Sequence, residues 1–418
     1  MSDHPRIVRR RSFWQFSAVE VRAHAIILAV VSWSIAIAVL TLGTTYRDPF
    51  GQLKWNDFVH FYTLGNIARH GPVSDLYDTQ ALYRHQVTLV PASVPERYLP
   101  VYPPQVALVF APLSDLPYHL AAGLWSLVSI GVYTFSVRSA WLPVRSALTN
   151  FRLVAVCAVG FAPFWSLILN GQTTAVPILA FSCAAVALSG GRKFLAGLAF
   201  GLLFIKPQFG LVLALVVVVC REWSILAGLA ACACIQLTLV LGLLGHTVLL
   251  DYVAVLRHIA ALQDALEPSV EQMHSLAVVT RLLPSGVSTV GWLVGTVVVS
   301  MMALRVWRST APAYVRTAML ALGSVLVNPH LNLYDGAVLA APLISLSGWI
   351  EMHSASLSEI RQKWHLAMYA LFLFLLLPTA RIIGLQFSPF VMLFLTYIVY
   401  RIVVRTEVRG TGGEPPLG

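Results

Sequence analysis

Long apolar runs separated by short polar stretches recur along most of the chain. A helix needs about 20 predominantly apolar residues to cross a bilayer, and the runs approach that length repeatedly. The pattern therefore predicts an all-α polytopic membrane protein with about twelve transmembrane helices. The predicted spans are residues 25–43, 112–137, 153–169, 175–189, 194–205, 208–220, 225–246, 286–306, 313–327, 336–350, 366–382 and 386–404.

Two of these spans, 194–205 and 208–220, are short, and Lys206-Pro207 separates them. Proline lacks a backbone donor and clashes with the preceding helical turn, so a helix breaks there. The two segments are therefore either two short spans or one broken helix. The first span, 25–43, is longer than the apolar core of a signal peptide, and we interpret it as a retained span.

Basic residues mark alternate ends of the spans, and the positive-inside rule then predicts that both termini are cytoplasmic. Residues 1–24 form a cytoplasmic N-terminal segment in this interpretation, and the Gly- and Pro-rich residues 405–418 form a disordered cytoplasmic tail. The transmembrane domain is residues 25–404. Two long loops, 44–111 and 247–285, lie on the outer side and are expected to contain short interfacial helices.

Composition supports a membrane protein and excludes several other classes. Mean hydropathy is +0.76, and only 11% of residues are charged, whereas soluble domains carry about 25%. The net charge of +10 comes from short basic groups scattered between apolar runs, which argues against nucleic acid as a partner. The cysteines lie in apolar runs and no Cys-x-x-Cys occurs, so neither a disulfide framework nor a cysteine metal site is expected. With no His-x-x-x-His and no paired-carboxylate cluster, we expect no metal and no cofactor.

The polar residues that are not basic anchors collect on the predicted outer face. Asp57 follows the first span, in "WNDFVHFYTLGNIARHG". It has two interpretations. It caps an amphipathic helix, a role that Asn56 could fill equally well, or it is a general base whose pKa is raised at a partly dehydrated interface. His60 lies one turn later and is a candidate substrate-binding residue.

Other candidates lie at the ends of spans on the same face. Lys206 either extends to the interface as a simple anchor or binds a phosphate as a compact cation. His330, in "NPHLNLYD", could donate hydrogen bonds to a phosphate or sugar. Asp335, in the same motif, is predicted to cap the following helix. Weaker candidates for substrate binding are Tyr102, Gln172, Asn332 and His274.

The segment around Tyr102 is rich in proline, which rules out one continuous helix there. A short apolar helix of about residues 105–111 is expected before the second span. Tyr102 either belongs to the interfacial aromatic belt or forms one wall of a groove facing the lipid.

The order of these motifs resembles family 87 of the glycosyltransferases. Asp57, "GPVSDLYD", "YPPQVALVFAPLSDLPY", "NGQ", "LAGLAFGLLFIKPQ" and "NPHLNLYD" follow one another over residues 25–350. The resemblance implies the membrane-embedded GT-C fold in the bacterial plasma membrane, with an extracytoplasmic site. The best-known relatives are polyprenyl-phosphate-mannose-dependent alpha-mannosyltransferases, which implies a polyprenyl-phosphate-linked hexose, mannose first, as the donor. The acceptor is then a lipid or glycan.

The resemblance also assigns roles to individual residues. The essential aspartate of the family lies in the first outer loop, which matches Asp57. A histidine near the late outer connection matches His330, and the Lys-Pro motif matches Lys206. The expected chemistry is an inverting, metal-independent transfer that needs one base, because the phosphate leaves without being protonated. Cations near the phosphate would stabilise its developing charge.

Two alternatives belong to other functional classes. A secondary transporter would place charged groups near mid-depth and often shows internal repeats, neither of which the sequence displays. A noncatalytic subunit of envelope polysaccharide export would tolerate Asp57→Ala.

Overall fold

The structure is a computed structural model that describes residues 18–258, 272–353, 358–377 and 379–411. Helices make up nearly all of the regular structure in these ranges. The only pairing between extended segments there consists of two isolated bridges, Arg47 with Leu53 and Met273 with Asn332. The all-α prediction is confirmed. The basic residues before position 18 and the middle of the second outer loop, 259–271, lie outside the described residues.

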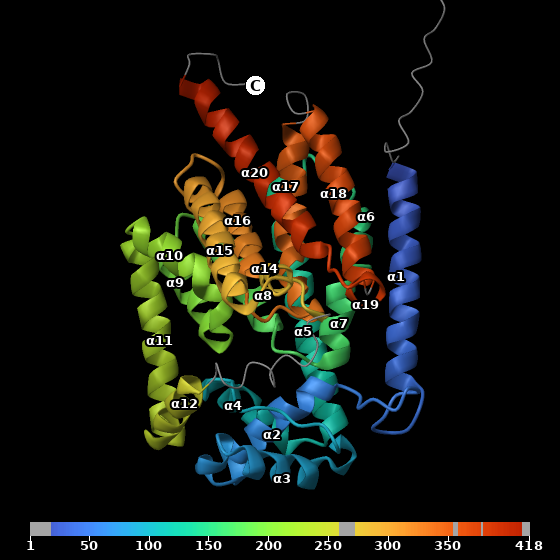
Figure 1. Cartoon of the computed structure of the whole chain (residues 1–418), viewed down its shortest axis with the longest axis vertical. Coiled ribbons are helices and arrows are strands. Elements are labelled where there is room, and N and C mark those ends of the chain that lie inside the picture. Colours follow the sequence, from blue (N-terminus) through green and yellow to red (C-terminus); the bar gives the residue numbers. More distant parts are fainter. Residues whose placement is uncertain (1–17, 259–271, 354–357, 378, 412–418) are drawn as a thin grey trace, which may run out of the picture.

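Six helical segments are long and apolar enough to cross a membrane (Figure 1). They are α1 (Ala18–Thr41), α5 (Tyr118–Trp141), α11 (Trp223–Leu244), α15 (Ser285–Trp307), η9 with α17 (Leu333–Leu339 and Ala340–Met352) and α20 (Ser388–Thr411). A seventh is counted if α6 (Phe151–Val159) and α7 (Ala162–Asn170), bent by 52°, form one broken span. The structure thus supports a membrane protein but does not confirm the predicted count of about twelve spans.

The remaining apolar helices are shorter than a bilayer requires. They are α8 (Ala175–Ser189), α9 with η5 (Lys193–Gly201 and Leu202–Ile205), η6 with α10 (Pro207–Gly210 and Leu211–Val219) and α16 (Ala313–Val327). A helix of 15 residues such as α8 or α16 is only about 22 Å long at 1.5 Å per residue. Such a segment tolerates irregular backbone at its end only where protein or a polar cavity surrounds it.

Helix α16 forms the centre of the bundle. Every residue from Thr317 to Val327 is buried, and a helix that is apolar on all sides is expected in a core rather than at a surface. It packs against α8, α15, α17 and α20. Its last residue leads directly into the polar connection 328–335, so the short length of α16 places that connection inside the protein.

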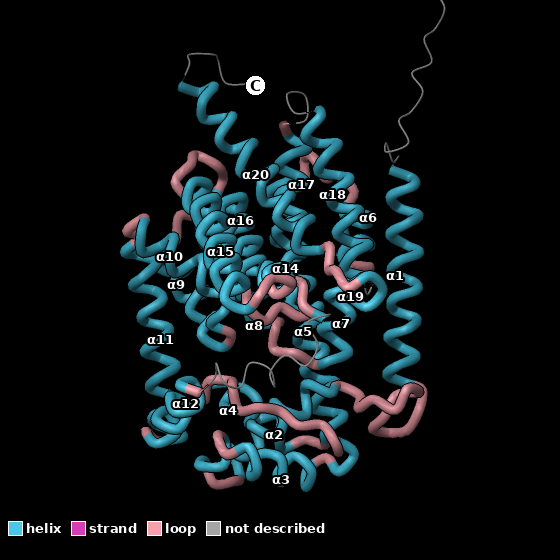
Figure 2. The backbone as a smooth tube through the Cα atoms, in the orientation of Figure 1, coloured by secondary structure: helices cyan, strands magenta, loops and turns pink. Residues whose placement is uncertain are grey.

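The predicted first outer loop folds into a separate helical block, called the outer block below (Figure 2). It contains α2 (Asn56–His70), η1 (Val73–Leu76), α3 (Thr79–Leu89), η2 (Pro91–Ser93), α4 (Gln105–Phe110) and η3 (Ala111–Asp115). The expected short helix near residues 105–111 is confirmed as α4. A Cβ at Gly65 would lie 2.5 Å from the Phe110 carbonyl carbon, so glycine allows α2 to pack closely against the end of α4.

The two described ends of the chain lie at one end of the molecule, opposite to α2, α3 and α4 (Figure 1). The far end of α11 reaches this block, where it packs against α4 and is followed by α12 (Thr247–Arg257). Three further helices complete the described bundle: α14 (Leu276–Thr280), α18 (Ser358–Leu376) and α19 (Thr379–Ile383). The expected disordered tail differs from the structure, because α20 continues through Thr411 and residues 405–411 are helical. Residues 412–418 lie outside the described ranges.

Candidate active site

Four segments that are far apart in the sequence meet at Lys206, which lies in the break between η5 and η6. Its ammonium nitrogen Nζ donates to Asp335 Oδ1 at 2.8 Å, to Thr174 Oγ1 at 3.1 Å and to Gln172 Oε1 at 3.2 Å. Gln172 in turn donates from Nε2 to Asp57 Oδ2 at 2.8 Å. One glutamine therefore connects the carboxylate at the start of α2 to the buried cation between the short apolar helices.

The start of α2 is held in place by Tyr98 of the first outer loop and by Tyr118, the first residue of α5. Trp55, the residue just before the helix, has a left-handed backbone with φ 53°. The hydroxyl of Tyr118 donates to the carbonyls of Lys54 and Trp55 at 2.9 and 2.8 Å, and that of Tyr98 donates to Asn56 at 2.6 Å. These bonds fix the direction in which the first turn of α2, and with it Asp57, points.

The capping interpretation of Asp57 is wrong. The residue before the helix is Trp55, and among the described residues no side chain caps α2. Asn56 accepts a hydrogen bond from the backbone N–H of Asp57 instead. The Asp57 carboxylate faces Gln172, so its position is explained by the polar network rather than by helix termination.

Gln172 is positioned by the tight turn between α7 and α8. Gly171 ends α7 with φ 64°, in the left-handed region where glycine carries no steric penalty. A Cβ at this position would lie 2.6 Å from Cβ of Phe58 on α2. The turn can therefore press against α2, which brings the amide of Gln172 within reach of Asp57.

Burial sets the protonation behaviour of Asp57. The surrounding protein raises the pKa of its carboxyl to about 6, an effect that the Gln172 hydrogen bond and the Lys206 charge partly oppose. Desolvation disfavours the charged form of an acid, whereas a donor and a nearby cation favour it. The side chain is only partly covered. Asp57 is thus partly accessible from solvent and has a proton affinity suited to a general base near neutral pH.

Lys206 and Asp335 form a buried ion pair. Their charged groups are 2.8 Å apart, and each side chain is only 3% exposed. The Lys206 Nζ also lies 5.3 Å from the centre of the Tyr334 ring. An unpaired charge at this depth would be strongly unfavourable, so each partner is required by the other.

The predicted capping role of Asp335 is therefore wrong. The sequence predicts that it caps the helix that follows, but the residue that precedes η9 is Asn332, and no described side chain caps that helix. Thr174, whose hydroxyl also donates to Asp335, is absent from the sequence-based candidates. The sequence does contain an indication of this ion pair. A lysine between apolar segments needs a counterion, and few acids lie in the connections on this face.

Tyr102 and Asn332 border this network. The phenol of Tyr102 interacts with the side chain of Gln172 and therefore lies beside the network. Asn332 donates to the hydroxyl of Tyr334 at 2.9 Å, and thereby connects to the aromatic ring beside Lys206. His330 lies in the same connection, where its backbone N–H donates to the side chain of Asn328 and burial lowers the pKa of its imidazole.

Two of the predicted substrate-binding histidines lie in other environments. His60 is 2% exposed, stacks on Tyr98 with ring centres 5.2 Å apart, and within the described ranges has no hydrogen-bond partner at either nitrogen. Burial lowers its pKa to about 3, which favours a neutral ring that packs in an aromatic cluster. His274 binds Ser388 at 2.8 Å and Gln386 at 3.0 Å, so it fastens the end of the second outer loop to α20.

The structure thus brings together Asp57, Gln172, Lys206 and Tyr102 from the predicted set and adds Thr174 and Asp335. His60 packs behind Tyr102, with ring centres 5.7 Å apart, and His274 lies in a separate cluster with Gln386 and Ser388. Across the residues that the structure describes, no group of three or more His, Cys, Asp or Glu side chains is arranged to hold a metal ion.

Comparison with known proteins supports the family that the motifs indicate. A family model described as "Glycosyltransferase family 87" matches residues 101–331, which include Gln172, Thr174, Lys206 and His330. A polyprenol-phosphate-mannose-dependent alpha-(1-2)-phosphatidylinositol pentamannoside mannosyltransferase of Mycolicibacterium smegmatis is 31% identical over 223 residues. This match covers 51% of the chain and 50% of the relative, so the chain spans about half the length of the curated relative it matches. No solved structure matches the chain.

Proposed function

The chain belongs to glycosyltransferase family 87, and we propose that it transfers a hexose from a polyprenyl-phosphate donor to the hydroxyl of a lipid or glycan acceptor. The observation that carries the mechanism is the hydrogen-bonded connection from Asp57 through Gln172 to Lys206. The mycobacterial relative uses polyprenol-phosphate mannose by its name, which makes mannose the first sugar to test. Family membership also supports a GT-C arrangement of the helices.

Asp57 acts as the general base in this proposal. Its carboxylate removes the proton from the acceptor hydroxyl as that oxygen attacks the anomeric carbon, and the bond to the phosphate oxygen breaks on the opposite face of the sugar. The configuration at the anomeric carbon is then inverted in a single displacement. A pKa of about 6 keeps most of the carboxyl ionised at neutral pH while leaving it basic enough to accept a proton.

Lys206 supplies positive charge for the leaving phosphate, with His330 as a second donor of hydrogen bonds. An ammonium group has three N–H donors, and Lys206 already uses them on Asp335, Thr174 and Gln172. Direct contact with a phosphate therefore requires one acceptor to move away. Gln172 makes the longest of the three contacts, and its release would also free the Asp57 carboxylate for the acceptor hydroxyl.

The reaction itself is tested with purified protein and a panel of polyprenyl-phosphate sugars, with a membrane lipid extract as acceptor and mass spectrometry as the readout. We expect a new lipid or glycan product that carries one added hexose, formed most rapidly with the mannose donor and unaffected by a metal chelator. Transport of a solute without transfer of any sugar would instead favour the transporter alternative.

We further propose that the protein lies in the bacterial plasma membrane with both termini cytoplasmic and the block of α2, α3 and α4 outside. The two described ends of the chain lie opposite to this block, as the alternation of basic residues at span ends requires.

Cysteines placed at two exposed hydroxyl-bearing residues test this orientation in a variant that lacks the native cysteines. Ser74→Cys, in the outer block, should react with an impermeant thiol reagent in intact cells, whereas Thr310→Cys, between α15 and α16, should not. Both should react once the cells are permeabilised. Labelling of Thr310→Cys alone in intact cells would reverse the topology and place the site in the cytoplasm.

A further inference from the structure

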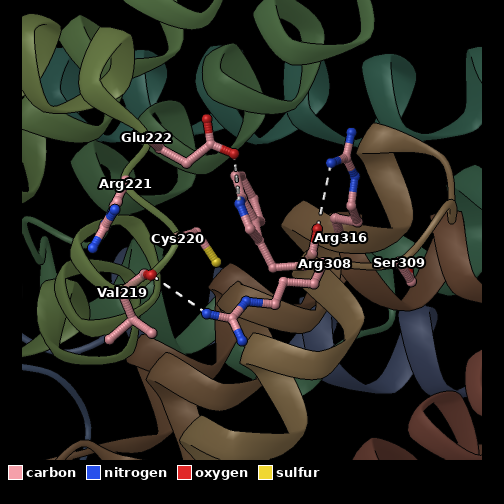
Figure 3. Close-up of a pocket in the computed structure, with 8 residues that line it drawn as sticks. Val219, Cys220, Arg221, Glu222, Arg308, Ser309 and Arg316 are labelled. Carbon is pink, nitrogen blue, oxygen red and sulfur yellow. Dashed lines mark hydrogen bonds between the residues drawn. The ribbon is translucent and has the colours of Figure 1, made fainter.

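A basic cavity lies at the end of the bundle that is remote from Asp57. Two turns form it, one between α10 and α11 and one between α15 and α16, and its volume is about 570 Å³ (Figure 3). Helix α11 begins beside the cavity at Trp223, and its last residue, Leu244, packs in the same core cluster as α2. Because α11 has 22 residues, about 33 Å of helix separates the cavity from the outer block. The cavity is therefore distinct from the proposed active site.

Arginine provides the charge of this cavity. Arg221, Arg308 and Arg316 line it, and Glu222 is the one acid among the lining residues in the described part of the chain. Both oxygens of Glu222 are engaged, because Lys193 donates to Oε2 at 2.9 Å and Trp307 donates to Oε1 at 3.0 Å. Since Lys193 balances the charge of Glu222, three arginine charges remain for another partner.

The donors of these arginines are largely unused within the described protein. Arg308 reaches the Val219 carbonyl at 3.4 Å and Arg316 reaches the Trp307 carbonyl at 3.5 Å, both longer than the usual 2.9–3.0 Å for an N–H···O bond. The Nε atom of Arg316 is buried without a hydrogen-bond partner among the described residues, while its guanidinium lies 5.4 Å from the centre of the Trp307 ring. Apart from these two long contacts, the terminal guanidinium nitrogens of Arg308 and Arg316 have no hydrogen-bond acceptor among the described residues, so they can donate to a ligand in the cavity.

Arg221 lies in the turn that ends α10, where its backbone N–H donates to the Val218 carbonyl and that of Glu222 to the Val217 carbonyl. Its φ of 53° lies in the left-handed region, which an L side chain occupies at a cost that glycine would avoid. The turn nevertheless carries an exposed arginine, whose side chain is among those that line the cavity (Figure 3).

The surface next to the cavity is apolar. Val218, Val219 and Trp223 are 57%, 42% and 69% exposed, and they flank Arg221 closely in the sequence. Tryptophan is enriched where membrane meets water. A charged ligand at this place would therefore have apolar surface beside it that is suited to acyl chains.

We propose that this cavity binds the phosphate of an anionic phospholipid headgroup in the leaflet opposite to the active site. Guanidinium groups match phosphate oxygens with paired, charge-assisted hydrogen bonds. Basic pockets between transmembrane helices are suited to such headgroups, and the exposed side chains of Val218, Val219 and Trp223 lie where the acyl chains would begin. Free inorganic phosphate offers the same oxygens but cannot use this apolar surface.

The test is native mass spectrometry of the purified full chain in detergent. The protein is titrated separately with phosphatidylglycerol, phosphatidylcholine and inorganic phosphate, and the affinity for each is compared. We expect phosphatidylglycerol to bind more tightly than phosphatidylcholine. The variants Arg221→Gln and Arg308→Gln replace exposed side chains and leave the Arg316–Trp307 contact intact. Each should lose about fivefold in affinity for phosphatidylglycerol, and the double variant should lose about 25-fold. Thermal unfolding in phosphatidylcholine confirms that the variants fold.

Arg192→Gln is the matched control, because it removes an exposed arginine from the neighbouring turn between α8 and α9 without changing the cavity lining. It should bind phosphatidylglycerol like the unmodified protein. Equal affinity for the two lipids, or an unchanged affinity in the folded double variant, would overturn the proposal. Binding of inorganic phosphate as tight as that of phosphatidylglycerol would refute the lipid assignment and leave a simple phosphate site.

Discussion

Asp57→Asn should yield a folded protein that still binds the donor but transfers sugar about 10²–10⁴ times more slowly, because the amide cannot accept the proton of the acceptor hydroxyl. The substitution preserves the size of the side chain. The Gln172 amide can keep one hydrogen bond to the new carbonyl oxygen, so the start of α2 should stay in place.

Thermal stability gives an internal check on this variant. The raised pKa of Asp57 means that the folded state holds its proton more tightly than the unfolded state. Ionisation therefore costs stability as the pH rises from the ordinary pKa of 3.8 through about 6. Because Asn carries no such cost, the unfolding temperature at neutral pH should be retained or raised.

Asp115→Asn is the matched control, since it makes the same substitution in the same outer block. Asp115 forms partly exposed ion pairs with Arg69 and His70, whereas the Gln172 amide donates to Asp57. The control should transfer sugar at a rate close to that of the unmodified protein. Normal turnover in Asp57→Asn would eliminate the proposed base, whatever the family membership.

Lys206→Met should both destabilise the protein and abolish transfer. Removing the cation leaves Asp335 buried without its partner, and breaking a buried ion pair costs about 3–5 kcal/mol. The double variant Lys206→Met with Asp335→Asn removes both charges and should recover much of the lost stability. Its transfer rate should remain low, because no cation then faces the leaving phosphate. Unfolding temperature, donor binding and turnover on the same preparations separate the two roles.

Lys193→Met serves as the control for the loss of a lysine in an ion pair. Lys193 is 54% exposed in its pair with Glu222, so its removal should change stability by less than about 1 kcal/mol. If the double variant of Lys206 and Asp335 regained normal turnover, the pair would be structural only and the proposed phosphate role of Lys206 would be wrong. A Lys206→Met protein as stable as the unmodified protein would contradict the buried pair itself.

Much of the candidate site could be predicted because topology alone restricts where polar groups can lie. In a chain of apolar spans, an acid after the first span and a lysine at a proline break stand out, and the basic residues indicate which of them share a face. Asp57, Gln172 and Lys206 stand out in this way, and the structure joins them by hydrogen bonds.

The side-chain contacts of the site residues could be predicted less well from the sequence. A helix cap and a buried counterion both place an acid in a polar connection next to a helix, so the sequence favours the commoner role for Asp335. Which of these roles Asp335 has depends on how deeply the connection 328–335 is buried, and that depth follows from the 15-residue length of α16. Likewise, His60 and His274 have polar side chains in outer segments, but only tertiary packing reveals that rings surround one and that Ser388 and Gln386 bind the other.

The structure does not confirm the predicted count of about twelve spans, for a related physical reason. Hydropathy identifies apolar segments, but it does not distinguish a helix that crosses the bilayer from one that ends at a polar site inside the protein. Helices α8 and α16, of 15 residues each, are shorter than a typical span, and their bounds at Ala175 and Val327 lie next to the network of Thr174 and the connection that holds Asp335.

The central claim, that Asp57 removes the acceptor proton, is tested most directly by the pH dependence of sugar transfer in a single turnover, with the donor already bound. The raised pKa predicts that the rate constant falls tenfold per pH unit at low pH, as the base becomes protonated, with an apparent pKa of about 6 or higher, because release of Gln172 removes a hydrogen bond that lowers the pKa of Asp57. Asp57→Asn should retain only a slow rate without this titration. A rate constant that does not change between about pH 5 and 8 in the unmodified protein, or the same titration in the folded Asn variant, would contradict the account.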